Sequence, residues 1–466
     1  MLILNFRGWD DFLLILTPPK QTKLQKGQPM STMNILLSSR TSAIPATEAT
    51  LDLLIRLQAP AQPKGKAKAS RPLPKRLALV VDRSGSMDGQ PLHEALRCVD
   101  HIATHLGVED QVAVVTYDDQ VDLLWPLQSS RNIEPLRAHL HRVTSGGSTD
   151  LHAGWQAGAR QLEAGTSDSI SRVLLLSDGQ ANHGETDPAT IAAQCAEWNS
   201  KGVSTTTVGL GRGFNEELMI AMARAGGGRQ YYGQTAEDLH DSFDEELALL
   251  QATCLRDIAL KLVAAPGVII EPLGNLPINA DGTWRLSDLA WDAETWMAVR
   301  LHVSASTAAT TRDLVSASFT ARNAEGGEEH IGPKLLSLPV VSAKEFQALV
   351  QDDAVAKRLD EVEFAQSSLQ LRDLARQGDR AGMRRLLDRL EKRFGHHPWL
   401  ADKLVNLRDL AERDAEMMAK EVHFSSVKLS QRLVAHMDLD YSQDETNAEI
   451  PAFLRKKASE GRGRRK

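Results

Sequence analysis

Residues 77–87 read LALVVDRSGSM, an apolar run that ends in an aspartate and two serines. A continuous apolar run of this length, followed by a helical pattern, is typical of a buried parallel strand. The helical pattern spans residues 91–106, where apolar side chains recur every three or four positions. This stretch therefore predicts an α/β fold, with the aspartate and serines in the loop after a strand.

Two further segments carry matching chemistry. Residues 173–179 read VLLLSDG, another apolar run that ends beside an aspartate, and residues 146–150 read GGSTD. Because ligands gather beyond the carboxyl ends of parallel strands, we expect these side chains to meet in one cleft. Carboxylates and hydroxyls are hard oxygen donors that suit Mg²⁺, and also Ca²⁺ or Mn²⁺. The predicted metal site consists of Asp82, Ser84, Ser86, Thr149 and Asp178.

This set of residues resembles the metal-ion-dependent adhesion site of von Willebrand factor type A domains, and the resemblance extends over roughly residues 74–250. It implies a Rossmann-like domain whose five site residues hold a metal ion, with a partner's Glu or Asp side chain in the last position. It implies no reaction. We therefore expect a bacterial intracellular interaction module, a scaffold or adaptor, rather than an enzyme.

The residues around the site predict the same architecture. Apolar patterns indicate strands at 111–117 and 203–208, an antiparallel edge strand at 121–127, and helices at 150–162 and 214–225. This alternation favours a doubly wound, mostly parallel sheet. The glycines between 209 and 213 are interpreted as a strand-to-helix turn, because the third glycine of a dinucleotide-binding loop is missing.

Short strands flank this central domain. They are expected at 49–58, 255–270, 283–289, 296–303, 314–321 and 334–341, a spacing typical of an antiparallel β-sandwich. We expect the strand at 49–58 to join the later ones, which makes the central domain an insertion. The alternative is that this strand forms an edge of the central domain.

Near the C-terminus, apolar residues recur at the spacing of an α-helix. Helices are expected at 345–376, 379–394 and 398–436, which predicts a small antiparallel bundle. His396 and His397 fall between two of these helices, and we interpret them as part of a surface loop rather than as metal ligands.

The expected domains are an extension (1–32), strands of the sandwich (33–59), a linker (60–73), the central domain (74–250), the sandwich (251–342), the bundle (343–436) and a disordered tail (437–466).

Two charged segments lie outside these domains. The stretch 60–76 is rich in Pro, Lys and Arg, and is interpreted as a solvated linker, with a basic contact strip as the alternative. Residues 449–457 resemble the C-terminal peptide of the bacterial division protein FtsZ, which docks on partner proteins. That resemblance implies a second partner bound through Ile450, Pro451, Phe453 and Leu454; the alternative is a solubilising tail.

Composition narrows the class of protein. The chain has 466 residues and a net charge of −7, which argues against bulk electrostatic binding of nucleic acid. Its three cysteines, Cys98, Cys195 and Cys254, lie in apolar patterns and are expected to be buried thiols of a cytoplasmic protein. We expect no membrane span, because no apolar run approaches the roughly 20 residues needed.

A metal-dependent hydrolase acting on phosphate esters is the alternative function. A metal-activated water would then need a base, for which Asp119 or Asp150 would have to serve. Ser84 or Ser86 would be a nucleophile only with a nearby base, and His93 and His183 are the candidates. Metal ligation explains the spacing of the serines without this extra requirement.

Overall fold

A computed structural model describes residues 33–62, 73–163, 169–211, 213–233, 237–274, 276–279, 281–305, 310–323, 325–431 and 434–435. The expectations for the N-terminal extension, most of the linker and the tail, including Ile450, Pro451, Phe453 and Leu454, lie outside the described residues. Within the described ranges, no helix is both long and apolar enough to cross a membrane.

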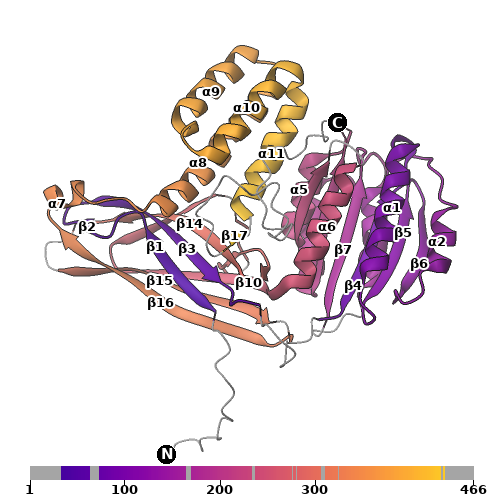
Figure 1. Ribbon diagram of the computed structural model, residues 1–466, viewed down its shortest axis with the longest axis horizontal. Coiled ribbons are helices and arrows are strands. Elements are labelled where there is room, and N and C mark those ends of the chain that lie inside the picture. Colours follow the sequence, from indigo (N-terminus) through magenta and orange to yellow (C-terminus); the bar gives the residue numbers. More distant parts are fainter. Residues whose placement is uncertain are drawn as a thin grey trace, which may run out of the picture. The chain divides into compact units, whose positions relative to one another are not determined.

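The central domain is built on one six-stranded sheet (Figure 1). All neighbouring strands are parallel except β6, which pairs antiparallel with β5 at one edge. The order is β6 (Val121–Ser129), β5 (Gln111–Tyr117), β4 (Lys75–Asp82), β7 (Ile170–Ser177), β8 (Val203–Leu210) and β9 (Gly227–Gly233). The doubly wound, mostly parallel sheet is therefore confirmed, with its predicted antiparallel edge.

Helices cover both faces of this sheet. One hydrophobic core contains Leu77 and Leu79 of β4 and lies under α1 (Gln90–His105), α2 (Glu134–Leu140) and α6 (Glu237–Ala252). The other contains Ala78 and Val80 and lies under α3 (Leu151–Gln161), α4 (Pro188–Ser200) and α5 (Glu216–Ala225). Because successive strand residues point to opposite faces, a strand covered on both sides must be apolar throughout.

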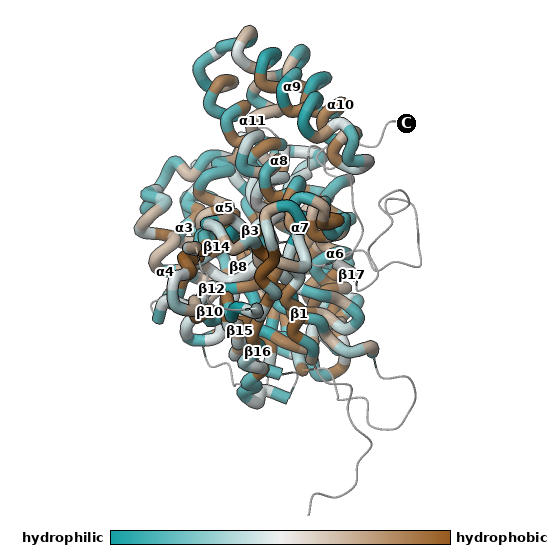
Figure 2. Tube along the Cα trace, turned by 90° about the vertical axis from the view of Figure 1, so that its left-hand side faces the viewer, coloured by the Kyte–Doolittle hydropathy of each residue, from teal (hydrophilic) through white to brown (hydrophobic). Residues whose placement is uncertain are grey.

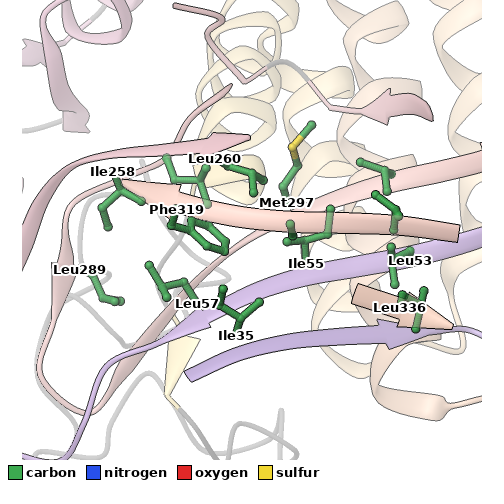
Figure 3. Close-up of a cluster of buried hydrophobic side chains, with 14 of the residues drawn as sticks. Ile35, Leu53, Ile55, Leu57, Ile258, Leu260, Leu289, Met297, Phe319 and Leu336 are labelled. Atoms are coloured by element: carbon green, nitrogen blue, oxygen red, sulfur yellow. The ribbon is translucent and has the colours of Figure 1, made fainter. Parts of the chain in front are cut away.

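Two sheets form the sandwich, and all their strand pairs are antiparallel except that of β16 with the short strand β2, which is parallel. One has the order β1 (Asn34–Ser39), β3 (Ala49–Gln58), β14 (Ala293–Val303) and β11 (Val268–Leu273), with β17 (Val434–Ala435) also paired to β14. The other has the order β12 (Trp284–Arg285), β10 (Thr253–Ala264), β15 (Thr311–Asn323), β16 (Glu328–Val341) and β2 (Ile44–Pro45), with β13 (Leu289–Ala290) paired to β10. Their inner faces share one apolar core (Figure 3).

The early strand belongs to this sandwich. β3 pairs with β14 at ten consecutive positions, from Gln58 opposite Glu294 to Ala49 opposite Val303. The chain thus forms part of the sandwich, leaves it to build the parallel sheet, and returns where α6 ends at Ala252 and β10 begins at Thr253. The strand at 49–58 is not an edge of the central domain.

Several sequence-based boundaries are wrong. The single strand expected at 255–270 is two strands, β10 and β11, separated by a turn in which Gly267 has a φ of 75°. The strand expected at 283–289 is replaced by the two-residue strands β12 and β13. Strand β9 and helices α2 and α6 were not predicted; β9 begins Gly-Gly-Arg-Gln, which lacks an apolar strand pattern, and α2 has only seven residues.

The C-terminal region is helical as expected, but with more breaks. It contains α7 (Ala343–Gln347), α8 (Asp353–Arg376), α9 (Arg380–Phe394), α10 (Pro398–Arg413) and α11 (Ala415–Gln431), so the ranges 345–376 and 398–436 are each divided. Figure 2 shows polar and apolar residues alternating along α9 and α10, the pattern of helices that bury one side.

The surface-loop interpretation is wrong for His397. This residue is buried at the N-terminus of α10, where its Nδ1 accepts a hydrogen bond of 3.3 Å from the Leu400 amide. His396 is exposed, and its Nε2 lies 3.4 Å from Asp360 Oδ2. A histidine that caps a helix is fixed by local backbone donors, which the sequence pattern around a Gly-His-His-Pro turn does not reveal.

A buried ionic network joins the central domain to the sandwich. Arg172 of β7 donates to Glu246 of α6 over 2.6 Å and to Asp288, between β12 and β13, over 2.8 Å. Burial alone would raise the pKa of Glu246, but the charge and hydrogen bond of Arg172 outweigh burial and lower it. The Arg172 side chain is 3% exposed, so this contact is shielded from solvent.

Helix α11 packs against the central domain. The ring of Phe424 lies 5.9 Å from that of Phe214 and 5.2 Å from that of Tyr232, and Lys420 Nζ donates to the Phe214 carbonyl over 3.2 Å. Phe214 follows the glycine-rich turn after β8, which leads into α5 as expected. The bundle therefore contacts the same edge of the sheet from which the site loops project.

Candidate metal site

The two aspartates of the predicted site lie at the ends of neighbouring strands. Asp82 is the last residue of β4, and Asp178 directly follows β7. The two strands are parallel, with Val81 opposite Leu176, so both carboxylates reach the same edge of the sheet. This is the placement expected for ligand-binding residues in an open α/β sheet.

Hydroxyl groups connect the two carboxylates. Ser86 Oγ donates to Asp178 Oδ1 over 2.7 Å and lies 3.2 Å from Ser84 Oγ. The Ser84 amide donates to Asp82 Oδ1 over 2.8 Å. Ser177, which was not predicted, donates to Asp82 Oδ2 over 2.6 Å. The structure thus brings Asp82, Ser84, Ser86 and Asp178 together.

Gly179 shows that Thr149 belongs to the same cluster. A Cβ atom built on Gly179 would lie 3.2 Å from Ser86 Oγ, 3.3 Å from Thr149 Oγ1 and 3.8 Å from Asp82 Oδ2. Oxygens from two separate segments, the loop of Asp82 and Ser86 and the loop of Thr149, therefore converge beside a residue of a third segment that has no side chain. A methyl group there would crowd the space in which these oxygens meet.

Backbone hydrogen bonds hold the loops in register. The Gly146 amide donates to the Arg83 carbonyl over 2.9 Å, and the Gly85 amide donates to the Gly147 carbonyl over 3.2 Å. The Thr149 amide donates to Asn182 Oδ1 over 2.9 Å. The loop that contains Thr149 is thereby fixed both to the serine loop and to the segment after Asp178.

Among the described residues, the two carboxylates of the site have no positively charged partner. Burial raises the pKa of Asp82, and burial together with the charge of Asp82 raises the pKa of Asp178 to about 6. In the described part of the chain, neither carboxylate forms an ion pair with a basic side chain; nearby Arg83 pairs with Asp118 and Asp122 instead. A bound cation would supply the missing charge.

The donor set selects among metals. The described residues contain no group of three or more His, Cys, Asp or Glu side chains able to hold a metal ion. The cluster offers two carboxylates and three hydroxyls, a set of oxygens that fits Mg²⁺, Ca²⁺ or Mn²⁺ and disfavours thiolate-seeking metals. The residues present thus fit a hard cation.

The residues considered as general bases make contacts outside the cluster of proposed metal ligands. Asp150 caps α3 by accepting a hydrogen bond of 2.9 Å from the Ala153 amide, and its other oxygen lies 3.3 Å from His183 Nδ1. His93 is exposed and lies 3.6 Å from its neighbour Glu94. Asp119 is exposed on the loop after β5. Among the hydrogen bonds of the described residues, none joins a histidine to Ser84 or Ser86.

Comparison with known proteins assigns the central domain. Residues 77–245 match the family model of the von Willebrand factor type A domain. Relatives include an uncharacterized protein of Synechocystis sp. (28% identity, covering 50% of this chain and 58% of that protein) and the uncharacterized protein YfbK of Escherichia coli (27%, 44% and 36%). A third is the inter-alpha-trypsin inhibitor heavy chain H4 of Homo sapiens (24%, 38% and 19%). The chain thus matches less than two thirds of the length of each.

Solved structures extend the likeness beyond this domain. A von Willebrand factor type A protein from Catenulispora acidiphila superposes with a TM-score of 0.66 at 16% identity, covering 84% of this chain and 96% of its own. The ArnB paralog VWA2 from Sulfolobus acidocaldarius gives 0.57 at 16%, covering 86% and 99%. At this identity the likeness concerns the fold alone. Residues 77–245 form a von Willebrand factor type A (VWA) domain.

Proposed function

We propose that this chain is a metal-dependent protein-interaction module. Asp82, Ser84, Ser86, Thr149 and Asp178 would hold a Mg²⁺ ion, and a protein partner would complete its shell with a Glu or Asp side chain. The observation that carries this proposal is the convergence of Asp82, Ser86 and Thr149 oxygens beside Gly179, with Ser84 and Asp178 in contact with Ser86. Among the described residues, neither carboxylate has a basic partner.

The composition of the site favours an acidic partner. Three of the five proposed ligands are neutral hydroxyls, so the two carboxylates at most balance a divalent charge. Ser86 is exposed, whereas Asp82 and Thr149 are buried, so solvent reaches the site on the side of Ser86. A carboxylate that approaches from this side would gain a hard ligand position and a favourable charge.

A metal–carboxylate contact would be a small part of an interface but a large part of its energy. A few central, desolvated contacts usually carry most of the affinity of a protein–protein interface. VWA domains are a family of interaction modules, and the names of six relatives denote heavy chains, which accords with a role within an assembly. We propose that the chain acts as a scaffold or adaptor.

Hydrolysis of phosphate esters is the weaker candidate. A general base must reach the proton it removes, directly or through one water. Asp150 is committed to the α3 cap and to His183, and both proposed nucleophiles already contact carboxylates that would serve the metal. These contacts favour metal ligation over nucleophilic attack as the role of Ser84 and Ser86.

The test is affinity purification of the full chain from its native cell, with the bound proteins identified by mass spectrometry. Wild type and Asp82→Ala are compared in Mg²⁺ and in EDTA. Asp119→Ala is the matched control, because Asp119 is an exposed carboxylate on a neighbouring loop. Partners lost with Asp82→Ala and with EDTA, but kept by Asp119→Ala, would support the proposal. Unchanged partner lists would contradict it.

A further inference from the structure

A second polar site lies where three parts of the chain meet. A cavity of about 190 Å³ is lined by α5 of the VWA domain, by α8 and α11 of the bundle, and by Gly274 after β11 of the sandwich. Arg224, Arg372 and His423 contribute its nitrogen-bearing side chains. Among the described residues that line the cavity, none is acidic.

Among the described residues, no carboxylate serves as a counter-ion for Arg224. It lies in the last turn of α5 and is only partly exposed. Burial lowers the pKa of its guanidinium. In the described ranges, no carboxylate lies within ion-pair distance of it, whereas Arg376 on the facing helix pairs with Glu216 over 3.0 Å. An arginine usually retains water or an anion at its five donors, so this one has donors to offer a ligand.

His423 presents a buried donor. Its Nε2 lies 3.5 Å from Arg372 Nη1, and since a guanidinium can only donate, Nε2 must be the accepting nitrogen. Burial and the charge of Arg372 lower the pKa of His423 to about 4, so the ring is neutral near pH 7 and its proton resides on Nδ1. Nδ1 is buried and has no hydrogen-bond partner in the described part of the chain.

Arg224 and His423 both have N–H groups without an acceptor among the described residues. A buried N–H group without an acceptor costs about 1–3 kcal/mol of stability. A nearby guanidinium cation also attracts a negatively charged ligand. The acids closest to this cluster are already engaged: Asp373 lies 3.3 Å from Arg372 Nε, and Glu216 pairs with Arg376. Arg372 keeps further donors on its Nη atoms.

We propose that this cavity binds a small oxyanion of phosphate geometry, held by the guanidinium groups of Arg224 and Arg372, with the His423 ring forming part of its wall. Arginine forks suit phosphate because they donate parallel hydrogen bonds to two of its oxygens. The small volume favours inorganic phosphate or the phosphate group of a small monoester. The bound anion would connect α5 of the VWA domain with α8 and α11 of the bundle.

The test is calorimetric titration of the full chain with inorganic phosphate and, separately, with glycerol 3-phosphate. EDTA and constant ionic strength keep divalent metals and bulk salt effects out of the measurement. We expect saturable binding with one site per chain, weakened about tenfold or more in Arg224→Gln. Arg385→Gln, an exposed arginine on α9, and Asp82→Ala should bind as wild type does.

The outcomes separate the possibilities. Binding of one phosphate compound but not the other identifies the source of the phosphate group. The proposal is overturned if neither binds saturably, if Arg224→Gln binds as tightly as wild type, or if acetate binds as tightly as phosphate.

Circular dichroism checks the fold of each variant. Gln366→Glu is a second variant, because it places a negative charge on the exposed rim and should also weaken phosphate binding about tenfold or more. Retained binding by Asp82→Ala separates this site from the proposed metal site.

Discussion

The hydroxyl of Ser86 donates a hydrogen bond of 2.7 Å to Asp178 Oδ1, across 92 positions of sequence. This contact joins the loop after β4 to the loop after β7, and the site loops are thus arranged by the protein's own hydrogen bonds. A serine hydroxyl can donate its proton to a carboxylate while a lone pair of its oxygen faces a cation. The observed geometry is therefore compatible with both groups serving one metal ion.

Gly179→Ala is expected to weaken Mg²⁺ binding while the protein remains folded. The added methyl group would lie 3.2 Å from Ser86 Oγ and 3.3 Å from Thr149 Oγ1, so both oxygens would have to shift by a few tenths of an ångström. We expect a loss of about tenfold in affinity, as for changes in the groups that orient metal ligands. Calorimetric titration with Mg²⁺ measures it.

Gly146→Ala is the matched control for that experiment. Gly146 lies in the neighbouring loop, its φ is not positive, and a Cβ there would meet no atom within 4 Å. Its amide hydrogen bond to Arg83 would remain available. Equal effects of the two substitutions would argue against a metal position beside Gly179.

Ser177→Ala should destabilise the metal-free protein. The substitution removes the 2.6 Å hydrogen bond to Asp82 Oδ2 and leaves a buried carboxylate oxygen without that donor. We expect the free energy of unfolding to fall by about 1–3 kcal/mol, measured by urea denaturation in EDTA. An unchanged midpoint would show that Ser177 does not hold Asp82 in place.

Arg172→Met should cost about 3–5 kcal/mol of unfolding free energy at pH 7, because it leaves the buried Glu246 and Asp288 without their shared cation. Arg172 lowers the pKa of Glu246 in the folded protein. Ionised Glu246 therefore contributes stability above its unfolded pKa of about 4.3, and this stability is lost as the pH falls through the pKa of the folded state. In the variant, burial raises this pKa. The deficit relative to wild type should therefore grow from pH 4 to pH 7; a constant deficit would contradict this role.

The three cysteines are expected to be unreactive in the native protein. Cys98, Cys195 and Cys254 are buried free thiols, and burial raises the pKa of Cys98 and of Cys254 to about 12 and raises that of Cys195 as well. Because the thiolate is the reactive form, a disulfide reagent at pH 8 should label none of them in the native state and all three in guanidinium chloride. Rapid native labelling would show that one of them is accessible.

The sequence predicted the strands whose apolar runs are continuous and end in polar residues, as in β4 and β7. It did not predict contacts that depend on neighbouring segments, such as the hydrogen bond of Ser177 to Asp82 or the position of Gly179. The break between α10 and α11 was missed because apolar spacing continues through Asp414. There the side chain accepts a hydrogen bond of 3.1 Å from the Met417 amide and starts a new helix. Local capping competes with helical periodicity, and only the folded chain shows which of them prevails.

The metal site is tested most directly by titrating Mg²⁺ into the purified full chain and into Asp82→Ala, with circular dichroism to compare their folds. We predict one saturable Mg²⁺ site in the wild type and none in Asp82→Ala, whose secondary structure should be unchanged. Absence of saturable binding of Mg²⁺, Ca²⁺ and Mn²⁺ by the wild type, or equal binding by the folded variant, would contradict the assignment of a metal to Asp82, Ser84, Ser86, Thr149 and Asp178.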